Sequence, residues 1–178
     1  GFTGGVDAVA GTLLERTVAF VNKKPVLLSD VELAKALLQV DEKQAVERAI
    51  DESLMFEDAS RLLSQPPAED AVAAARLSLE QKAGPGFTLP ALRRKAVIQI
   101  AIANYIDLRL RPLVRVEDAE VRQAFNERVI SEAEPPAFSR VAVSLRESLE
   151  RESLDRKIEE WISALRRTAE IRRPDPRP

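Results

Sequence analysis

Histidine and cysteine are both missing from this 178-residue chain, and aromatic residues make up only 4% of it. Without histidine the chain lacks the usual proton shuttle near neutral pH, and without cysteine it lacks the strongest side-chain nucleophile. Serine–histidine–aspartate and cysteine–histidine catalytic sites are therefore excluded, and so are the ligands that zinc sites use most often. The lack of cysteine fits any redox compartment, because neither disulfides nor free thiols can form.

Net charge is also low, because 27 Lys and Arg residues nearly balance 29 Asp and Glu residues, for a net of −2. A nucleic-acid-binding domain usually carries a basic excess on one face, so no nucleic-acid partner is expected. The hydrophobic fraction of 45% is ordinary for a globular protein. Since aromatics are scarce, Ala, Leu, Ile and Val must supply most of the core.

Neighbouring charged residues do not mark a reaction centre. Adjacent residues on a helix point to different sides, so these pairs are interpreted as surface charge. The pairs are Asp51-Glu52, Glu57-Asp58, Glu159-Glu160, Arg93-Arg94 and Arg166-Arg167. Gly84-Pro85-Gly86 has neither the spacing nor the Lys-Ser/Thr of a phosphate loop. The chain is therefore expected not to be an enzyme and to need no metal or other cofactor.

The clearest local pattern lies near the start of the chain. Val18–Val21 and Val26–Leu28 favour strands, and Asn22–Pro25 supplies a turn between them. Ser29 is then expected to cap a helix, with Glu32 reaching back to complete a capping box. The preceding residues 1–14 are rich in Gly and Ala and are expected to form a flexible arm.

Apolar periodicity, caps and breakers predict a series of helices. Their approximate ranges are 30–39, 41–63 with Asp41 as cap, 68–83, 88 to the break at Pro112, and 117–129. The segment Ala96–Ile106 is apolar nearly all round, and its alternating isoleucines would also suit a strand. Its Ala content and its length between breakers favour a central, buried helix. It is too short to cross a bilayer, which takes about 20 apolar residues, so no membrane insertion is expected.

The C-terminal part begins with a Pro-rich linker, predicted at 131–140, followed by a long helix at 141–168. Leu154, Ile158, Ile162 and Leu165 share one stripe of this helix with Trp161, the only tryptophan, which is therefore expected to face the core. A short β-prone stretch, 169–172, follows the helix. Residues 174–178 contain three prolines and are expected to form a disordered tail.

Taken in order, these segments resemble the SurA family of periplasmic chaperones. The matching segments are Thr17–Asn22 with Pro25–Val31 (opening hairpin and helix), Val46–Leu54 (next helix), Val116–Arg122 (helix closing the N-terminal module) and Ile158–Arg167 with Ala169–Ile171 (C-terminal helix and strand). In that family the C-terminal elements fold back onto the N-terminal module and complete it.

The resemblance implies a mainly α fold, like the SurA N-terminal domain, with a small β-element formed by the N-terminal hairpin and a C-terminal strand. It implies a single chaperone-like domain over 15–173. Its parts would be an N-terminal module at 15–130, the linker at 131–140, and a returning helix and strand at 141–173. SurA-type proteins usually place parvulin prolyl-isomerase domains before the returning helix. The linker here is far too short for one, so the chain is predicted to be parvulin-less.

The function implied by the resemblance is ATP-independent binding of unfolded polypeptides, with outer-membrane protein precursors as expected clients and no prolyl isomerase activity. The implied location is the periplasm. Residues 1–11 do not show the charged start and apolar run of a secretory signal, so the chain is expected to be a mature form.

Candidate client-binding residues are large apolar side chains near turns or helix ends. They are Leu27, Phe87, Leu89, Tyr105 and Leu108. For each of them core packing is the alternative interpretation, because large apolar residues mostly lie inside. A second functional hypothesis is a helical scaffold or assembly subunit that binds one specific folded partner. A homodimer formed by exchange of the C-terminal helix is a further hypothesis about partners.

Overall fold

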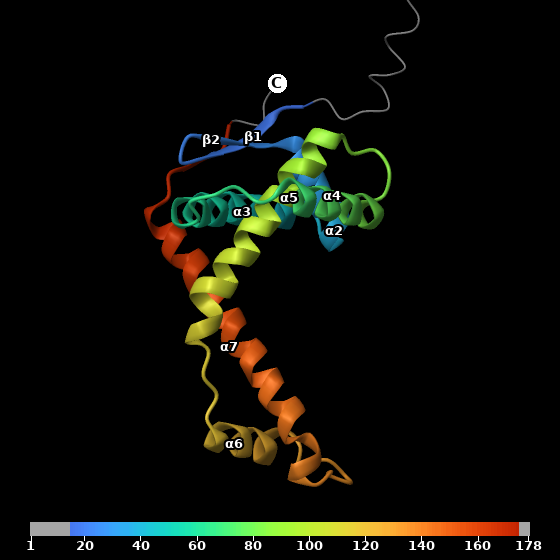
Figure 1. Ribbon diagram of the computed structural model, residues 1–178, viewed down its shortest axis with the longest axis vertical. Coiled ribbons are helices and arrows are strands. Elements are labelled where there is room, and N and C mark those ends of the chain that lie inside the picture. The colour runs from blue at the N-terminus through green and yellow to red at the C-terminus, as the bar shows by residue number, and fades with distance from the viewer. Residues whose placement is uncertain (1–14, 175–178) are drawn as a thin grey trace, which may run out of the picture. The chain divides into compact units, whose positions relative to one another are not determined.

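The computed structural model describes residues 15–174. The predicted arm at 1–14, and all of the predicted tail except Pro174, lie outside the described residues. The described chain is mainly helical and carries a small antiparallel sheet of three strands (Figure 1). The predicted mainly α fold, with a β-element built from both ends of the chain, is therefore confirmed.

The elements follow one another with short connections. They are β1 (Thr17–Val21), β2 (Lys24–Leu27), α2 (Leu28–Leu38), α3 (Glu42–Leu62), α4 (Glu69–Ala83), α5 (Leu89–Tyr105), the π-helical turn η1 (Ile106–Leu110), the 3₁₀ turn η2 (Arg111–Leu113), α6 (Asp118–Arg128), α7 (Phe138–Thr168) and β3 (Ile171–Arg172). Helix α7 begins at Phe138, inside the linker predicted at 131–140, so the linker is shorter than predicted. Proline fixes its own φ angle and disfavours a helical conformation of the residue before it. Neither restriction applies to the residues after Pro136, which can therefore form a helix.

The chain divides into two compact units. The first unit comprises the residues up to Tyr105 together with those from Ile162 onward, and the second unit is Ile106–Trp161. These boundaries differ from the predicted ones, which placed the N-terminal module at 15–130 and the returning helix and strand at 141–173. Helix α7 contributes most of its length to the second unit and its last residues to the first.

The hairpin turn is tighter than predicted. Only Asn22 and Lys23 form it, with φ angles of 49° and 70°. Lys24 and Pro25 instead belong to β2, where they pair with Val21 and Phe20. Two consecutive residues with positive φ form the kind of two-residue turn that matches the twist of antiparallel strands, and Asn tolerates this conformation well.

The start of α2 also differs from the prediction. Leu27 precedes the helix, and its N–H donates to the Asp30 carboxylate at 3.0 Å. Ser29 lies within the helix, and its N–H and hydroxyl donate to the carboxylate of Glu15. The expected capping by Ser29 and Glu32 was therefore wrong, because Asp30 already occupies the position three residues after the cap. The predicted Asp41 cap of α3 is confirmed, since its carboxylate accepts the Gln44 N–H at 2.8 Å.

The first unit has two buried clusters, one between the sheet and helices α2 and α3, and one among helices α2, α4 and α5. Figure 1 shows the sheet lying across one side of this helical layer. Ala19 of β1 and Ile50 of α3 are completely buried in the cluster beside the sheet. Leu33 of α2 and Ala96 of α5 are completely buried in the cluster among the helices. The segment around Ile98 is helical, so the strand alternative for this stretch is wrong.

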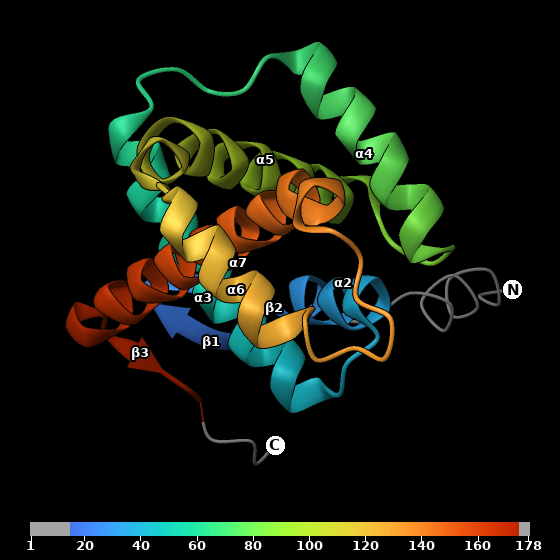
Figure 2. The same ribbon diagram turned by 90° about the horizontal axis from the view of Figure 1, so that it is seen from below.

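The C-terminal segment closes the first unit. Strand β3 pairs antiparallel with β1, so that β1 is the central strand (Figure 2). Asn22 adds two further bonds of 2.8 Å, since its N–H donates to the Glu170 carbonyl and its side-chain oxygen accepts the Glu170 N–H. Leu165 and Ile171 pack against the buried cluster that contains Ala19 and Val21. Trp161, the last residue of the second unit, is buried, as its place on the apolar stripe predicted.

Arg166 ties this segment to α3. Its guanidinium donates to Asp51 at 2.6 Å and to the Glu47 carboxylate at 2.8 Å, and Arg173 reaches the other oxygen of Glu47 at 2.5 Å. Burial by itself would raise the pKa of Glu47, but the hydrogen bonds and charges of the two arginines outweigh it and hold the pKa below 4.5. The interpretation of Arg166 and Asp51 as free surface charge was therefore wrong.

The second unit has a small core of its own between α6 and the first part of α7. Val121, Ala124 and Leu145 are buried there. The rings of Phe125 and Phe138 meet edge to face, with centroids 5.4 Å apart. Arg146 bonds to the Val116 carbonyl and to Asp118, and Arg128 forms a two-pronged pair with Glu152 at 2.8 and 3.1 Å.

Replacing Arg166 should loosen the C-terminal closure. We expect Arg166→Ala to lower the free energy of unfolding by about 1–3 kcal/mol, because Glu47 and Asp51 both lose a charged donor. Arg167→Ala is the matched control, since Arg167 is exposed, and it should stay within about 0.5 kcal/mol of wild type. Urea unfolding followed by circular dichroism measures both. Equal effects of the two substitutions would contradict the role given to Arg166.

The Glu47 contact should also make stability depend on pH. A carboxyl group with a lowered folded-state pKa stabilises the fold above its unfolded pKa, and this stabilisation is lost as pH falls through the folded pKa. At pH 7 we therefore expect wild type to be more stable than Glu47→Gln. The difference should shrink once the pH falls below about 4.5, the ordinary pKa of the group. A difference that stays constant between pH 7 and pH 3 would refute this expectation.

Candidate cavity and groove of the first unit

A buried ion pair connects α3 and α5. Lys95 donates to the Glu52 carboxylate at 2.5 Å, and only 7% of Lys95 and 8% of Glu52 are exposed. Arg48, one turn before Glu52, donates to the other carboxylate oxygen at 3.0 Å. The interpretation of Glu52 as surface charge was wrong.

The sequence does contain a signal for this pair. Glu52 lies at helical spacing from Ala45, Ala49 and Ala59, which are all buried, so it falls on the apolar stripe of α3. Lys95 lies in the same way four residues after the buried Ala91. Two opposite charges on the apolar stripes of two helices are the pattern expected of a buried pair, because a lone buried charge is strongly unfavourable.

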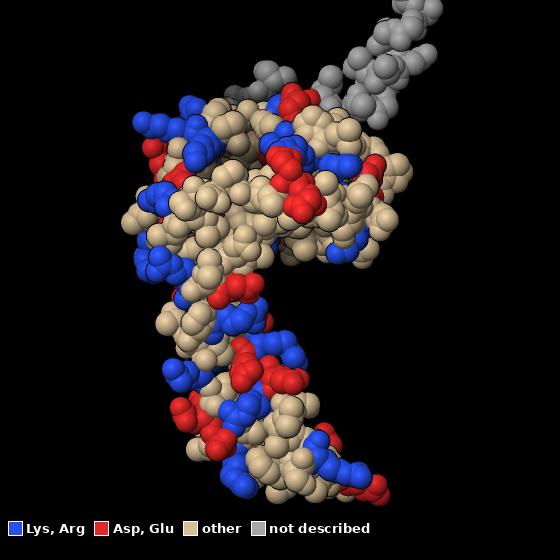
Figure 3. Space-filling model, in the orientation of Figure 1, with Lys and Arg blue, Asp and Glu red and all other residues tan. Residues whose placement is uncertain are grey.

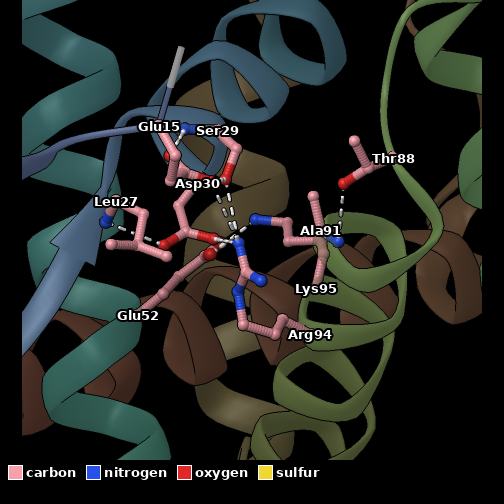
Figure 4. A network of polar contacts seen from close by, with 9 residues as sticks. All are labelled: Glu15, Leu27, Ser29, Asp30, Glu52, Thr88, Ala91, Arg94 and Lys95. Carbon is pink, nitrogen blue, oxygen red and sulfur yellow. Dashed lines mark hydrogen bonds and ion pairs between the residues drawn. The ribbon is translucent and has the colours of Figure 1, made fainter. Parts of the chain in front are cut away.

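A second polar cluster surrounds Arg94, the neighbour of Lys95 (Figure 4). The Arg94 guanidinium donates to the Ser29 hydroxyl at 2.8 Å and to Asp30 at 3.4 Å, and it lies 3.9 Å from Glu15. Burial tends to raise the pKa of Glu15, but hydrogen bonds from Ser29 and the charge of Arg94 lower it overall. This cluster joins the start of α2 to α5, so Arg94 is not part of a free solvated face either.

Beside these two clusters lies a cavity of about 230 Å³, which we call the central cavity. It is formed by β2, the start of α2, α3 and α5. Its lining consists of Lys24, Pro25, Val26, Leu27, Asp30, Ala49, Glu52, Ser53, Phe56, Arg94, Lys95 and Ile98. Most of the surface that these residues expose to the cavity is apolar, while three ion-paired cations, Lys24, Arg94 and Lys95, lie in its wall.

Two further hollows adjoin the central cavity, and all three are lined by Phe56. One, of about 370 Å³, is bounded by Phe56, Pro90, Arg93, Arg94, Val97 and Ile98. The other, of about 630 Å³, lies by the connection between α3 and α4 and is bounded by Phe56, Ser60, Leu63, Ser64, Gln65, Pro66, Pro67, Ala68, Val97, Ala101 and Asn104. We call the three together the Phe56 groove.

Exposed charge near the groove is paired. Arg93, at the rim, forms two bonds with Glu69 of α4 at 2.7 and 2.9 Å. These bonds, together with the arginine charge, lower the pKa of Glu69 and raise that of Arg93. In Figure 3, the face of the first unit that is shown presents a broad uncharged area, with basic and acidic side chains beside one another around it.

The structure separates the five residues that were predicted to bind clients. Leu27 lines the central cavity. Phe87 is half-buried and packs against the core cluster of Leu33 and Leu92. Leu89 is 59% exposed at the start of α5, and Leu108 is 65% exposed in the second unit.

Tyr105 is half-buried at the end of α5. Of the five predicted residues, only Leu27 lines the Phe56 groove. The other four, Phe87, Leu89, Tyr105 and Leu108, do not. Phe56, Val97 and Ile98, which do line it, were not singled out from sequence, because their periodicity resembles that of ordinary core residues.

The described residues contain no cluster of three or more acidic, histidine or cysteine side chains that could hold a metal ion. Between residues 15 and 174, no helix has the length and apolarity that a membrane crossing requires.

Comparison with known proteins identifies no family. No protein-family model matches the chain, and no curated protein matches it. The SurA resemblance therefore stays a prediction.

Breaking the buried ion pair should be costly. We expect Glu52→Gln, which leaves Lys95 buried without its counter-charge, to lower the free energy of unfolding by about 3–5 kcal/mol. The double variant Glu52→Leu with Lys95→Met should recover most of that loss, because no buried charge then remains. Chemical unfolding of wild type, Glu52→Leu, Lys95→Met and the double variant completes the cycle, with Glu52→Gln measured beside them. A double variant as unstable as Glu52→Gln would show that the pair is not what makes the site sensitive.

Proposed function

We propose that this protein is an ATP-independent periplasmic chaperone of the SurA type, which binds unfolded polypeptides through the Phe56 groove and has no prolyl isomerase activity. Outer-membrane protein precursors are the clients that the SurA resemblance favours. The observation that carries the proposal is a group of three hollows that share Phe56. Two of them expose mostly apolar surface, and the third, beside the connection between α3 and α4, exposes polar and apolar surface in similar amounts.

Three separate hollows that share Phe56 favour an extended chain as the ligand. A small ligand occupies one pocket, whereas a polypeptide can place different side chains in different hollows. Burial of apolar area stabilises such contact by about 25 cal/mol per Å², spread over several side chains. Weak contacts that tolerate many sequences fit a chaperone that releases its clients without nucleotide hydrolysis.

The sheet edge beside the groove favours recognition of side chains over addition of a strand. Pro25 in β2 has no N–H to offer, and the N–H of Leu27 already donates to Asp30. A bound chain would therefore find few free backbone donors along β2. The hollows, rather than the strand edge, are the surface that a client can use.

A scaffold that binds one folded partner is the alternative from a different class. Such a protein would leave unfolded polypeptides unaffected and would co-purify with a single partner. A prolyl isomerase, by contrast, would accelerate cis/trans relaxation of a proline peptide, and we expect no acceleration.

The proposal is tested by suppression of aggregation. Near-stoichiometric wild-type protein should reduce light scattering of reduced insulin, of heated citrate synthase and of a urea-diluted outer-membrane β-barrel protein. Phe56→Ser should need at least about threefold more protein for the same effect, because all three hollows lose an apolar wall.

Leu77→Ser is the matched control for Phe56→Ser. It also removes a large apolar side chain, one that is 52% exposed on α4 and lines none of the three hollows, and it should act like wild type. If wild type leaves all three client proteins to aggregate, the chaperone proposal fails. If both variants lose activity equally, the groove is not the surface.

A further inference from the structure

The sheet has two edges, and they differ in what they offer to an added strand. Strand β1 lies in the middle, with β2 at one edge and β3 at the other. On β2, Pro25 has no N–H and the N–H of Leu27 already donates to Asp30. No strand of the described chain pairs with the outer side of β3, which Figure 2 shows at the rim of the first unit. The edge formed by β3 is therefore the open one.

The pairing of β3 with β1 decides which of its main-chain groups face outward. The N–H of Asn22 donates to the Glu170 carbonyl at 2.8 Å, and Phe20 pairs with Arg172. In an antiparallel pair, opposed residues alternate between those that exchange hydrogen bonds and those that do not. Ile171 lies between Glu170 and Arg172, so its N–H and carbonyl point away from β1. These two groups are available to a further strand.

Unpaired positive charge lies beside this edge. The C-terminal segment 162–174 carries four arginines and one glutamate. Two of the arginines are neutralised by carboxylates of α3, as described above. Between residues 15 and 174, no carboxylate forms an ion pair with Arg172 or with Lys23 of the hairpin turn. A bound group with negative charge would therefore meet cations that need not leave another partner.

These two cations line a hollow of about 350 Å³ on the sheet, together with Phe20 and Glu170. The guanidinium of Arg172 lies over the Phe20 ring, 4.6 Å from its centroid, and this contact favours its position on the solvent face of the sheet. Two cations against one carboxylate leave the lining of the hollow with a net positive charge. The hollow therefore favours an acidic side chain.

We propose that the β3 edge docks an extended acidic segment of a polypeptide, which adds to the sheet as a fourth strand antiparallel to β3. Its main chain exchanges two hydrogen bonds with Ile171, and an acidic side chain lies opposite Arg172. Antiparallel addition continues the pattern of the other two pairs in the sheet. Neither Ile171 nor Arg172 lines the Phe56 groove, so this surface is separate from the one in the proposed function.

The charge preference is tested with two short fluorescein-labelled peptides and fluorescence anisotropy. One peptide alternates valine with glutamate and the other alternates valine with lysine, so that both have the same apolar content. We expect wild type to bind the glutamate peptide at least about tenfold more tightly at low salt. Added salt should reduce the difference, because the cations are exposed. Equal affinity, or a preference for the lysine peptide, would overturn the proposal.

The main-chain bonds are tested by N-methylation of the glutamate peptide, which removes N–H donors without changing the charge. Directly opposed residues of an antiparallel pair direct their side chains to the same face. With glutamates on the face of Arg172, the valines lie on the face of Ile171, and their N–H groups are the ones that reach Ile171. Methylation of the valines should therefore abolish binding, whereas methylation of the glutamates should change affinity less than about twofold. Equal losses, or a loss from methylated glutamates alone, would exclude this strand.

Reversing one charge at the edge should reverse the preference. Arg172→Glu should weaken the glutamate peptide at least about tenfold and strengthen the lysine peptide. Lys82→Glu makes the same change of charge at an exposed position of α4, and should bind both peptides like wild type. Unchanged binding, or loss of both peptides, in a folded Arg172→Glu protein would contradict the role given to Arg172. The methylated peptides test the strand on wild type, whatever this variant does.

Backbone amide NMR locates the bound peptide. The largest shifts should fall on residues 20–23 and 169–173, and hydrogen exchange of the Ile171 amide should slow at least about tenfold. Phe56→Ser alters the groove and should bind the glutamate peptide like wild type. Largest shifts on residues 24–27 and 94–98, or loss of the peptide in folded Phe56→Ser, would place the peptide in the groove and overturn the β3 edge.

Discussion

The docking of the C-terminal segment onto β1 and α3 is the interaction on which the first unit depends. A two-stranded hairpin is only marginally stable by itself, and β3 supplies the third strand that makes β1 central. The closure brings together residues more than a hundred positions apart, such as Arg166 and Asp51. Such contacts must offset a large loss of chain entropy. The half-buried charges of Arg166 and Glu47 do so together with Leu165 and Ile171, which pack against a buried cluster drawn from both the sheet and α3.

The same closure shapes the candidate site. With β1 held in the middle of the sheet, β2 lies at an edge, where Pro25 and Leu27 form one wall of the central cavity. The opposite walls come from α3 and α5, whose relation is set by Glu52 and Lys95. A buried ion pair gives little net stability, because desolvation cancels much of the attraction. It does penalise any sliding of α3 against α5, since a shifted register would leave each charge buried without its partner.

The charged groups around the candidate site are arranged in ion pairs. These groups neutralise one another, so the cavity offers a ligand mostly apolar surface. These properties suit recognition of many uncharged apolar segments rather than of one exact molecule. The second unit, Ile106–Trp161, has a small core of its own that includes Val121, Ala124 and Leu145.

The sequence by itself determined the helices, their breakers and the Asp41 cap, and indicated that both ends contribute strands, because these features depend on neighbouring residues and on periodicity. It could not reveal that Glu52 and Lys95 meet, that Arg166 leaves the solvent to reach α3, or that Phe56 rather than Leu89 lines a groove. Those outcomes depend on which helix faces come together. The sequence pattern around a charged or an apolar residue is the same whether its side chain contacts solvent, another helix or an open cavity. Only the tertiary packing decides among these, because burial and pairing belong to two segments at once.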